Sequence, residues 1–286
     1  MVLFDKDQVP NPDLGPFWKW QKKNFDKFVN LSESVEASLL AMNGRIQYEW
    51  SPTARHMVMN HNYVEFMHKI ADVPHDPQIK FYATADEKAW AKKQRDHMKY
   101  DNMIIWSLAG SSVHKTWAGL DNVIASIFLA FPSTAIMLVG GPECTILEAG
   151  WENEPRVFRT CGKFNIRQTL AMLDHADLVI GPETGVLNAA SGMDMPKICF
   201  LSHSTHENLT RDWKNVVPMF SENTECPGRG KNEVPACHMM HFGFDYCRRH
   251  EESGVAQCMA DISVQQVWGA VEEQMTKIVE RKRIAA

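Results

Sequence analysis

The sequence lacks the features that would place it in a membrane, in a secretory pathway or on duplex nucleic acid. Its 286 residues contain no apolar run of the roughly 18 residues that span a bilayer. The first 15 residues, MVLFDKDQVPNPDLG, lack the charged-then-apolar pattern of a signal peptide. The formal net charge of −5 provides no overall basic surface for DNA or RNA, although this net charge does not exclude a local basic groove. We therefore expect a cytoplasmic protein.

Two nucleotide-binding signatures are also missing. No expected strand is followed by the GxGxxG fingerprint, which counts against an NAD(P) or FAD enzyme, and there is no Walker A pattern, which counts against a P-loop ATPase or kinase. Internal repeats and low-complexity segments are absent as well. The length predicts one large domain or two smaller ones.

Hydrophobic runs that alternate with helical patterns begin at residue 101. The expected strands are 103–110, 134–141, 155–162, 178–183, 197–202 and 215–220, with helices at 118–131 and 165–176. This alternation predicts βαβ units and a parallel sheet, hence an α/β, Rossmann-like domain over 101 to about 222. Before it we expect a short strand at 25–32 and helices at 33–42, 53–71 and 85–99. A last helix is expected at 263–282, started by a Ser263–Gln266 capping box and carrying an apolar stripe.

Small and polar residues follow three of the expected strands. Ligands of open parallel sheets bind at the carboxyl ends of the strands, where free N–H groups hold phosphate oxygens. The candidate residues for a phosphate or nucleotide ligand are Gly110, Ser111, Ser112 and Lys115 after the first strand, Gly140 and Gly141 after the second, and Glu183, Thr184, Gly185 and Asn188 after the fourth. The alternatives are a plain turn with an exposed Lys115, a tight turn at the paired glycines, and a helix-capping acid at Glu183. Ser202 to Thr205, after the fifth strand, is expected on the rim.

The ordered segments SLAGSSVHKTW, IMLVGG, LVIGPETGVLNAA and HENLTRDW together resemble the C-terminal domain of glycosyltransferase family 9. This family comprises the ADP-heptose:lipopolysaccharide heptosyltransferases and their relatives, and the chain looks most similar to a phage and proteobacterial branch. The likeness runs over about residues 101 to 282, and FDKFVNLSESVE resembles the end of the family's N-terminal domain.

The resemblance implies a GT-B fold, with residues 1–100 as a partial, acceptor-side N-terminal region and 101–286 as the donor-binding domain. By this comparison Ser111, Ser112 and Lys115 hold the donor diphosphate, and Glu183, Thr184 and Gly185 stand where the family has Asp-Thr/Ser-Gly. Asn188 stands where the family often has His. The start of the family's N-terminal domain, with the Gly-Asp loop that supplies its catalytic base, has no counterpart here. The base is unknown; His114, Glu183 and acids near the N-terminus are candidates.

Four cysteines are clustered in a loop expected at 226–258. Cys226, Cys237, Cys247 and Cys258 are separated by ten, nine and ten residues, which is no CxxC zinc signature. Three states of these cysteines are compatible with the sequence. The four thiolates form a structural zinc site, with His238 and His241 as alternative ligands; or they form a disulfide; or they are free buried thiols.

The resemblance predicts a glycosyltransferase that moves a heptose-like or other sugar from a nucleotide-diphospho-sugar, in first place an ADP-sugar, to a hydroxyl acceptor. The acceptor could be a lipopolysaccharide core, another glycan or a modified DNA base. Transfer needs no cofactor. The alternatives are a non-catalytic nucleotide-sugar-binding or interaction protein derived from a shortened transferase, and a GT-B-like epimerase. We also expect a homo-oligomer, located in the cytoplasm or at the periphery of the inner membrane.

Overall fold

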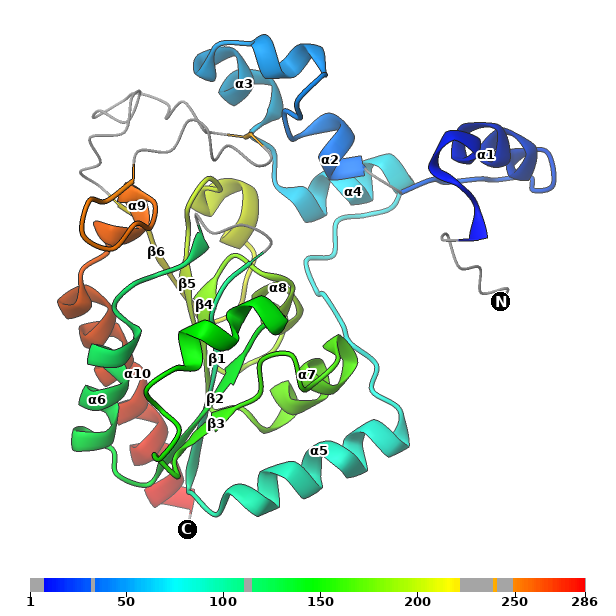
Figure 1. Cartoon of the computed structure of the whole chain (residues 1–286). Helices are drawn as coiled ribbons and strands as arrows, with labels where there is room; N and C mark the ends of the chain where they lie inside the picture. The colour runs from blue at the N-terminus through cyan, green and yellow to red at the C-terminus, as the bar shows by residue number, and fades with distance from the viewer. Residues whose placement is uncertain (1–7, 32–33, 111–114, 222–238, 241–248, 286) are drawn as a thin grey trace.

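The computed structural model describes residues 8–31, 34–110, 115–221, 239–240 and 249–285 (Figure 1). The strands are β1 (Asn102–Ser107), β2 (Thr134–Val139), β3 (Val157–Arg159), β4 (Leu178–Pro182), β5 (Lys197–Phe200) and β6 (Val216–Met219). All the neighbouring strands pair in parallel, in the order β3-β2-β1-β4-β5-β6. This is the strand order of the Rossmann fold, in which the direction of winding reverses between β1 and β4. The parallel α/β sheet predicted from the sequence is confirmed.

Helices cover both faces of this sheet. They are α5 (Ala85–Met98), α6 (Leu120–Ala130), α7 (Ile166–Met172), α8 (Gly185–Ala190), α9 (Gln257–Ala260) and α10 (Val264–Ala285), with short helices η5 (Pro142–Glu148), η6 (Leu173–His175) and η7 (His206–Thr210). Helices α6 and α10 pack on one face, against Ile104 and Trp106 of β1. Helices α5, α7 and α8 pack on the other, against Met103 and Ile105. Successive residues of β1 point to opposite faces, and both faces are buried, so the strand reads as a continuous apolar run.

The last helix follows its sequence pattern closely. The Ser263 Oγ accepts the Gln266 N–H (3.2 Å), and the Gln266 side chain accepts the Ser263 N–H (2.9 Å), so the predicted capping box is confirmed. The apolar stripe is buried in the core at Val267, Val271, Met275 and Ile278. Because this stripe covers one face of the sheet, α10 is a structural element of the sheet domain.

A smaller unit lies beyond the carboxyl ends of the strands (Figure 1). It contains α2 (Ser34–Ser38), η3 (Ile46–Glu49), α3 (Pro52–Met59) and α4 (Tyr63–Ala71). Its own core is small and includes Leu39, Met59 and Met240. We call residues 34–71 the N-terminal unit. The predicted helix 53–71 is interrupted at 60–62, where the Asn62 side chain accepts the N–H groups of Val64 and Glu65 and starts α4.

The prediction of a strand at 25–32 is wrong for residues 25–31, because these residues form neither helix nor strand. A strand needs a neighbouring strand for its N–H and C=O groups, and every strand of the described sheet lies after residue 101. Phe25 is 60% exposed. The helix before it, η2 (Asn11–Asp13) continuing as α1 (Leu14–Lys22), stands apart from the sheet domain (Figure 1) and exposes Trp20. Such unpacked aromatic surface is consistent with the expected homo-oligomer, which stays a prediction.

Among the helices of the described residues, none is both long enough and apolar enough to cross a bilayer.

At Gly181 of β4, any side chain would strain the backbone. Its φ is +155°, and a Cβ there would lie 2.6 Å from the Ser107 carbonyl oxygen of β1. We expect Gly181→Ala to lower the free energy of unfolding by about 2 kcal/mol, since the clash is with backbone in the centre of the sheet. Urea denaturation checks this, with Gly269→Ala as control. A Cβ at Gly269 meets nothing within 4 Å in α10, so that variant is expected to be neutral or slightly stabilised. Equal stability of the two variants would contradict the clash.

Candidate functional site

A pocket of about 540 Å³ opens at the carboxyl ends of β1, β2 and β4. It lies where the winding of the sheet reverses, the usual position of a ligand in an open α/β sheet. Its volume falls in the range of small-molecule sites, about 300 to 1,000 Å³. The pocket therefore has the position and the size of a ligand site.

The residues predicted as a site come together here. All the residues predicted to bind the phosphate or nucleotide that the structure describes line the pocket: Gly110, Lys115, Gly140, Gly141, Glu183, Thr184, Gly185 and Asn188. Ser111 and Ser112, and the candidate base His114, lie outside the described residues. The structure thus places residues from three separate turns around one cavity, while their role in holding a donor stays a prediction.

Among the described residues that line the pocket, Lys115 is the one lysine or arginine. Its Nζ donates a hydrogen bond to the Glu183 carbonyl oxygen (3.1 Å), which ties the turn after β1 to the turn after β4. Gly110 permits this arrangement, because a Cβ there would lie 2.7 Å from the Lys115 Cδ. An ammonium group held beside open turns is suited to neutralise a phosphate.

The turn after β2 is a close-packed one. A Cβ at Gly140 would lie 2.6 Å from the Cys144 Sγ and 3.3 Å from the Cys161 Sγ, so the backbone at Gly140 packs directly on two buried thiols. Glu143, three residues after Gly140, also lines the pocket. The sequence prediction missed Glu143. The signal in the sequence was a carboxylate two residues after Gly141, where it can accept hydrogen bonds from ligand hydroxyls.

The turn after β4 leads into α8. Thr184 is its N-cap: the Thr184 Oγ1 accepts the Leu187 N–H (3.5 Å) and lies 3.2 Å from the Ser107 Oγ of β1. Asn188 is one turn further along the helix and lines the same pocket. These contacts hold the strand end and the helix start together, so the pocket wall is preformed on this side.

The Glu183 carboxylate is built into this wall. Its Oε1 accepts the Ser202 Oγ–H (2.5 Å), the Ser202 N–H (2.8 Å) and the His203 N–H (3.2 Å). The His203 Nδ1 lies 3.4 Å from the same oxygen. Glu183 thus joins the end of β4 to the end of β5. Ser202 and Ser204, expected on the rim, are buried, because they surround this carboxylate.

The charge state of Glu183 follows from these contacts. Burial raises the pKa of the carboxyl, but the charges of His203 and Lys115 and the hydrogen bonds from Ser202 and Ser204 outweigh burial and lower the pKa to about 2. Glu183 is therefore ionised at neutral pH. A carboxylate whose Oε1 accepts three hydrogen bonds from the end of β5 is suited to shape the site.

Helix α7 adds a wall that the sequence prediction also missed. Phe164, Ile166 and Thr169 line the pocket at the start of this helix. The start is set by a capping box in which Asn165 and Gln168 exchange hydrogen bonds of 2.9 and 3.0 Å. The capping box could have been recognised in the sequence, but the direction in which α7 packs could not.

The structure leaves the metal prediction open. Cys226, Cys237 and Cys247 lie outside the described residues. Cys258, in α9, is buried in the apolar core with Met259 and Ile262. Within the described part of the chain there is no group of three or more His, Cys, Asp or Glu side chains that could hold a metal ion. The zinc site stays a prediction.

Comparison with known proteins identifies the family. The model of glycosyltransferase family 9 (heptosyltransferase) matches residues 30–237. The chain therefore belongs to glycosyltransferase family 9, and the resemblance predicted from the sequence is confirmed. None of the curated proteins compared with the chain matches it.

Two solved structures show the same fold at low sequence identity. The ADP-heptose lipopolysaccharide heptosyltransferase II of E. coli is 12% identical with a TM-score of 0.51, over 80% of this chain and 61% of that chain. The glycosyltransferase family 9 protein of Veillonella parvula DSM 2008 is 13% identical with a TM-score of 0.55, over 76% of this chain and 61% of that one. The GT-B-like α/β fold is thereby confirmed. The chain spans about three-fifths of the length of each relative.

Proposed function

We propose that this chain binds a nucleotide-diphospho-sugar in the pocket at the carboxyl ends of β1, β2 and β4 and acts as a glycosyltransferase. The observation that carries the proposal is the convergence of Lys115, the glycine turns at 110 and 140–141, and the Thr184 cap on one cavity of about 540 Å³. Family membership supports the same ligand class.

Different residues of the pocket would bind different parts of the donor. Lys115 and the backbone of the turns after β1 and β4 would bind the diphosphate and stabilise the negative charge that develops as it leaves. Glu143 would accept hydrogen bonds from hydroxyl groups of the nucleotide or the sugar, and Asn188 can both donate and accept. The ring of Phe164 and the side chains of Ile166 and Val186 supply apolar surface.

The reaction is a displacement at the anomeric carbon. An acceptor hydroxyl forms the new C–O bond, the bond from that carbon to the phosphate oxygen breaks, and the nucleoside diphosphate leaves with the electron pair. The acceptor proton passes to a base, which is not assigned. An ADP-sugar is the first candidate donor, because a structurally similar relative is an ADP-heptose enzyme. A glycan is the first candidate acceptor.

Turnover of the donor tests this function. The chain is incubated with ADP-heptose and lipopolysaccharide core glycan, and mass spectrometry follows the glycan and the nucleotide. The proposal predicts a glycan heavier by one heptose for each ADP released. Binding of the donor without transfer would favour the second candidate, a non-catalytic nucleotide-sugar-binding protein.

A further inference from the structure

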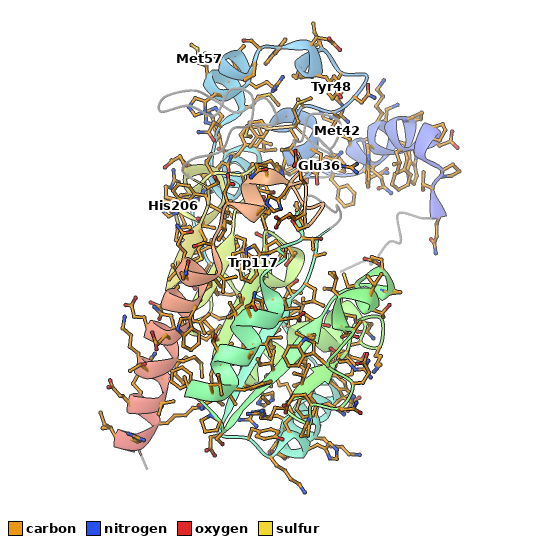
Figure 2. All side chains as sticks on the ribbon, turned by 60° about the vertical axis from the view of Figure 1, so that its left-hand side comes forward. Glu36, Met42, Tyr48, Met57, Trp117 and His206 are labelled. Atoms are coloured by element: carbon orange, nitrogen blue, oxygen red, sulfur yellow. The ribbon has the colours of Figure 1, made fainter. Side chains whose placement is uncertain are left out.

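The start of α4 is fixed against the sheet domain close to the pocket. The Asn60 Oδ1 accepts hydrogen bonds from the Asn208 Nδ2 (3.1 Å) and the Thr205 Oγ1 (3.3 Å), and the Asn62 Nδ2 donates to the Glu207 carbonyl oxygen (3.4 Å). These partners belong to η7 and its N-cap Thr205, which follows the last residue of β5 by five positions. In Figure 2, His206 of this segment lies at the left of the view, below Met57 of the N-terminal unit.

An ion-pair network reinforces the same junction. Arg211 contacts Glu65 of α4 at 2.7 Å and Glu207 of η7 at 2.6 Å. Asp212 contacts Arg211 at 3.2 Å and the His75 Nε2 at 3.1 Å. Together with the asparagine contacts, this network holds the first turn of α4 in a defined position over the end of β5.

Tyr63, the first residue of α4, points its hydroxyl into this junction. The hydroxyl is buried beside Ser204, which also hydrogen-bonds the Glu183 carboxylate, yet no hydrogen bond of ordinary length and angle to a described residue satisfies it. Burial and the charge of Glu183 raise the pKa of Tyr63 far above its usual value, so the hydroxyl stays neutral. A buried hydroxyl without a well-formed bond is uncommon in proteins and calls for a partner.

A continuous path leads from this hydroxyl to the pocket. Ser204 lies beside both the Tyr63 hydroxyl and the Glu183 carboxylate, and it lowers the pKa of each. The main-chain carbonyl oxygen of Glu183 accepts a hydrogen bond from the Lys115 Nζ (3.1 Å). Each step is a polar contact between groups that are buried or line the pocket. A shift of Ser204 would therefore move the residue that holds the pocket's lysine.

We propose that Tyr63 is a positioning residue of the donor pocket: in the ligand-bound protein its hydroxyl donates to Ser204 and thereby fixes Glu183 and Lys115. The N-terminal unit thus contributes to a pocket whose lining belongs to the sheet domain. This inference rests on the proposed function, because its effect is on the binding of a nucleoside diphosphate.

The test is a double-mutant cycle on ADP affinity, measured by calorimetric titration of the full chain. Tyr63→Phe removes only the hydroxyl and is expected to weaken ADP binding about tenfold, the effect of one lost hydrogen bond to a charged network. In a Ser204→Ala background the same change is expected to have no further effect, because the path is already broken. Tyr48→Phe, in the same unit, is the matched control and is expected to bind as wild type.

The outcomes distinguish a failure of the positioning role of Tyr63 from a failure of the proposed function. Wild-type affinity in Tyr63→Phe, or a full additional tenfold loss in the Ser204→Ala background, would overturn the positioning role. The latter is what a merely structural contribution of Tyr63 would produce. An absence of ADP, UDP and GDP binding in the wild-type chain would overturn the proposed function, and this inference with it.

Discussion

Lys115→Ala should weaken the binding of a nucleoside diphosphate about 100-fold while leaving the fold intact. The ammonium group lies in the pocket lining, and it reaches the Glu183 carbonyl oxygen from the turn after β1. Removing the charge that faces a phosphate inside a pocket costs about 3 kcal/mol, which corresponds to that factor. Calorimetric titration with ADP measures the loss, and Lys115→Arg, which keeps the charge, should lose much less.

Lys163→Ala is the matched control for this loss. Lys163 precedes the pocket residue Phe164, but its Nζ donates to the Arg159 carbonyl oxygen (2.8 Å). If Lys115 acts inside the pocket, the Lys163 variant keeps wild-type affinity. Equal losses in both variants would mean that only the general positive charge of the region matters, and the specific role of Lys115 would be wrong.

Glu183→Gln should remove a large part of the acid sensitivity of folding. The pKa of Glu183 is about 2 in the folded chain, below its ordinary value of 4.5. Between these values the unfolded chain binds a proton that the folded chain does not. The contribution of Glu183 is therefore complete above about pH 4.5 and is lost as the pH falls towards 2. The shift corresponds to about 3 kcal/mol, of which about 2 kcal/mol is lost by pH 3.

Urea denaturation from pH 7 to pH 3 measures this effect. Wild type should lose about 2 kcal/mol more than Glu183→Gln over that interval. Glu87→Gln is the control: the pKa of Glu87 is also about 2, since it accepts hydrogen bonds from Arg167 and Thr84, but it lies at the surface, where water weakens such pairs. An unchanged pH dependence in Glu183→Gln would show that the hydrogen bonds at Ser202 and His203 do not stabilise the fold.

Much of the sheet domain could be predicted because its signals are local. Strands buried on both faces read as apolar runs, and the Ser263 capping box marks the start of α10. Parallel strands present their carboxyl ends at one edge of the sheet, and this rule predicts that Gly110, Gly140 and Thr184 share one site. That rule works on chain order alone.

The rest depended on packing that one sequence does not encode locally. Residues 25–31 have a strand pattern but form no strand, because pairing requires a neighbour. Helix α7 contributes Phe164 and Thr169 to the pocket only through the direction in which it packs. The contact of Tyr63 with Ser204 joins residues far apart in the chain, and no spacing rule predicts it. The Glu183 carboxylate, which lines the pocket, also receives hydrogen bonds from Ser202 and His203, and no spacing in the sequence predicts these partners.

The most direct test of this account is a calorimetric titration of the wild-type chain with ADP, UDP and GDP and their sugars. The account predicts saturable binding of one diphosphate at one site per chain, ADP in first place, with the corresponding nucleotide-sugar competing for the same site. The absence of saturable binding by all three diphosphates would contradict it, and the pocket at the ends of β1, β2 and β4 would then not be a donor site.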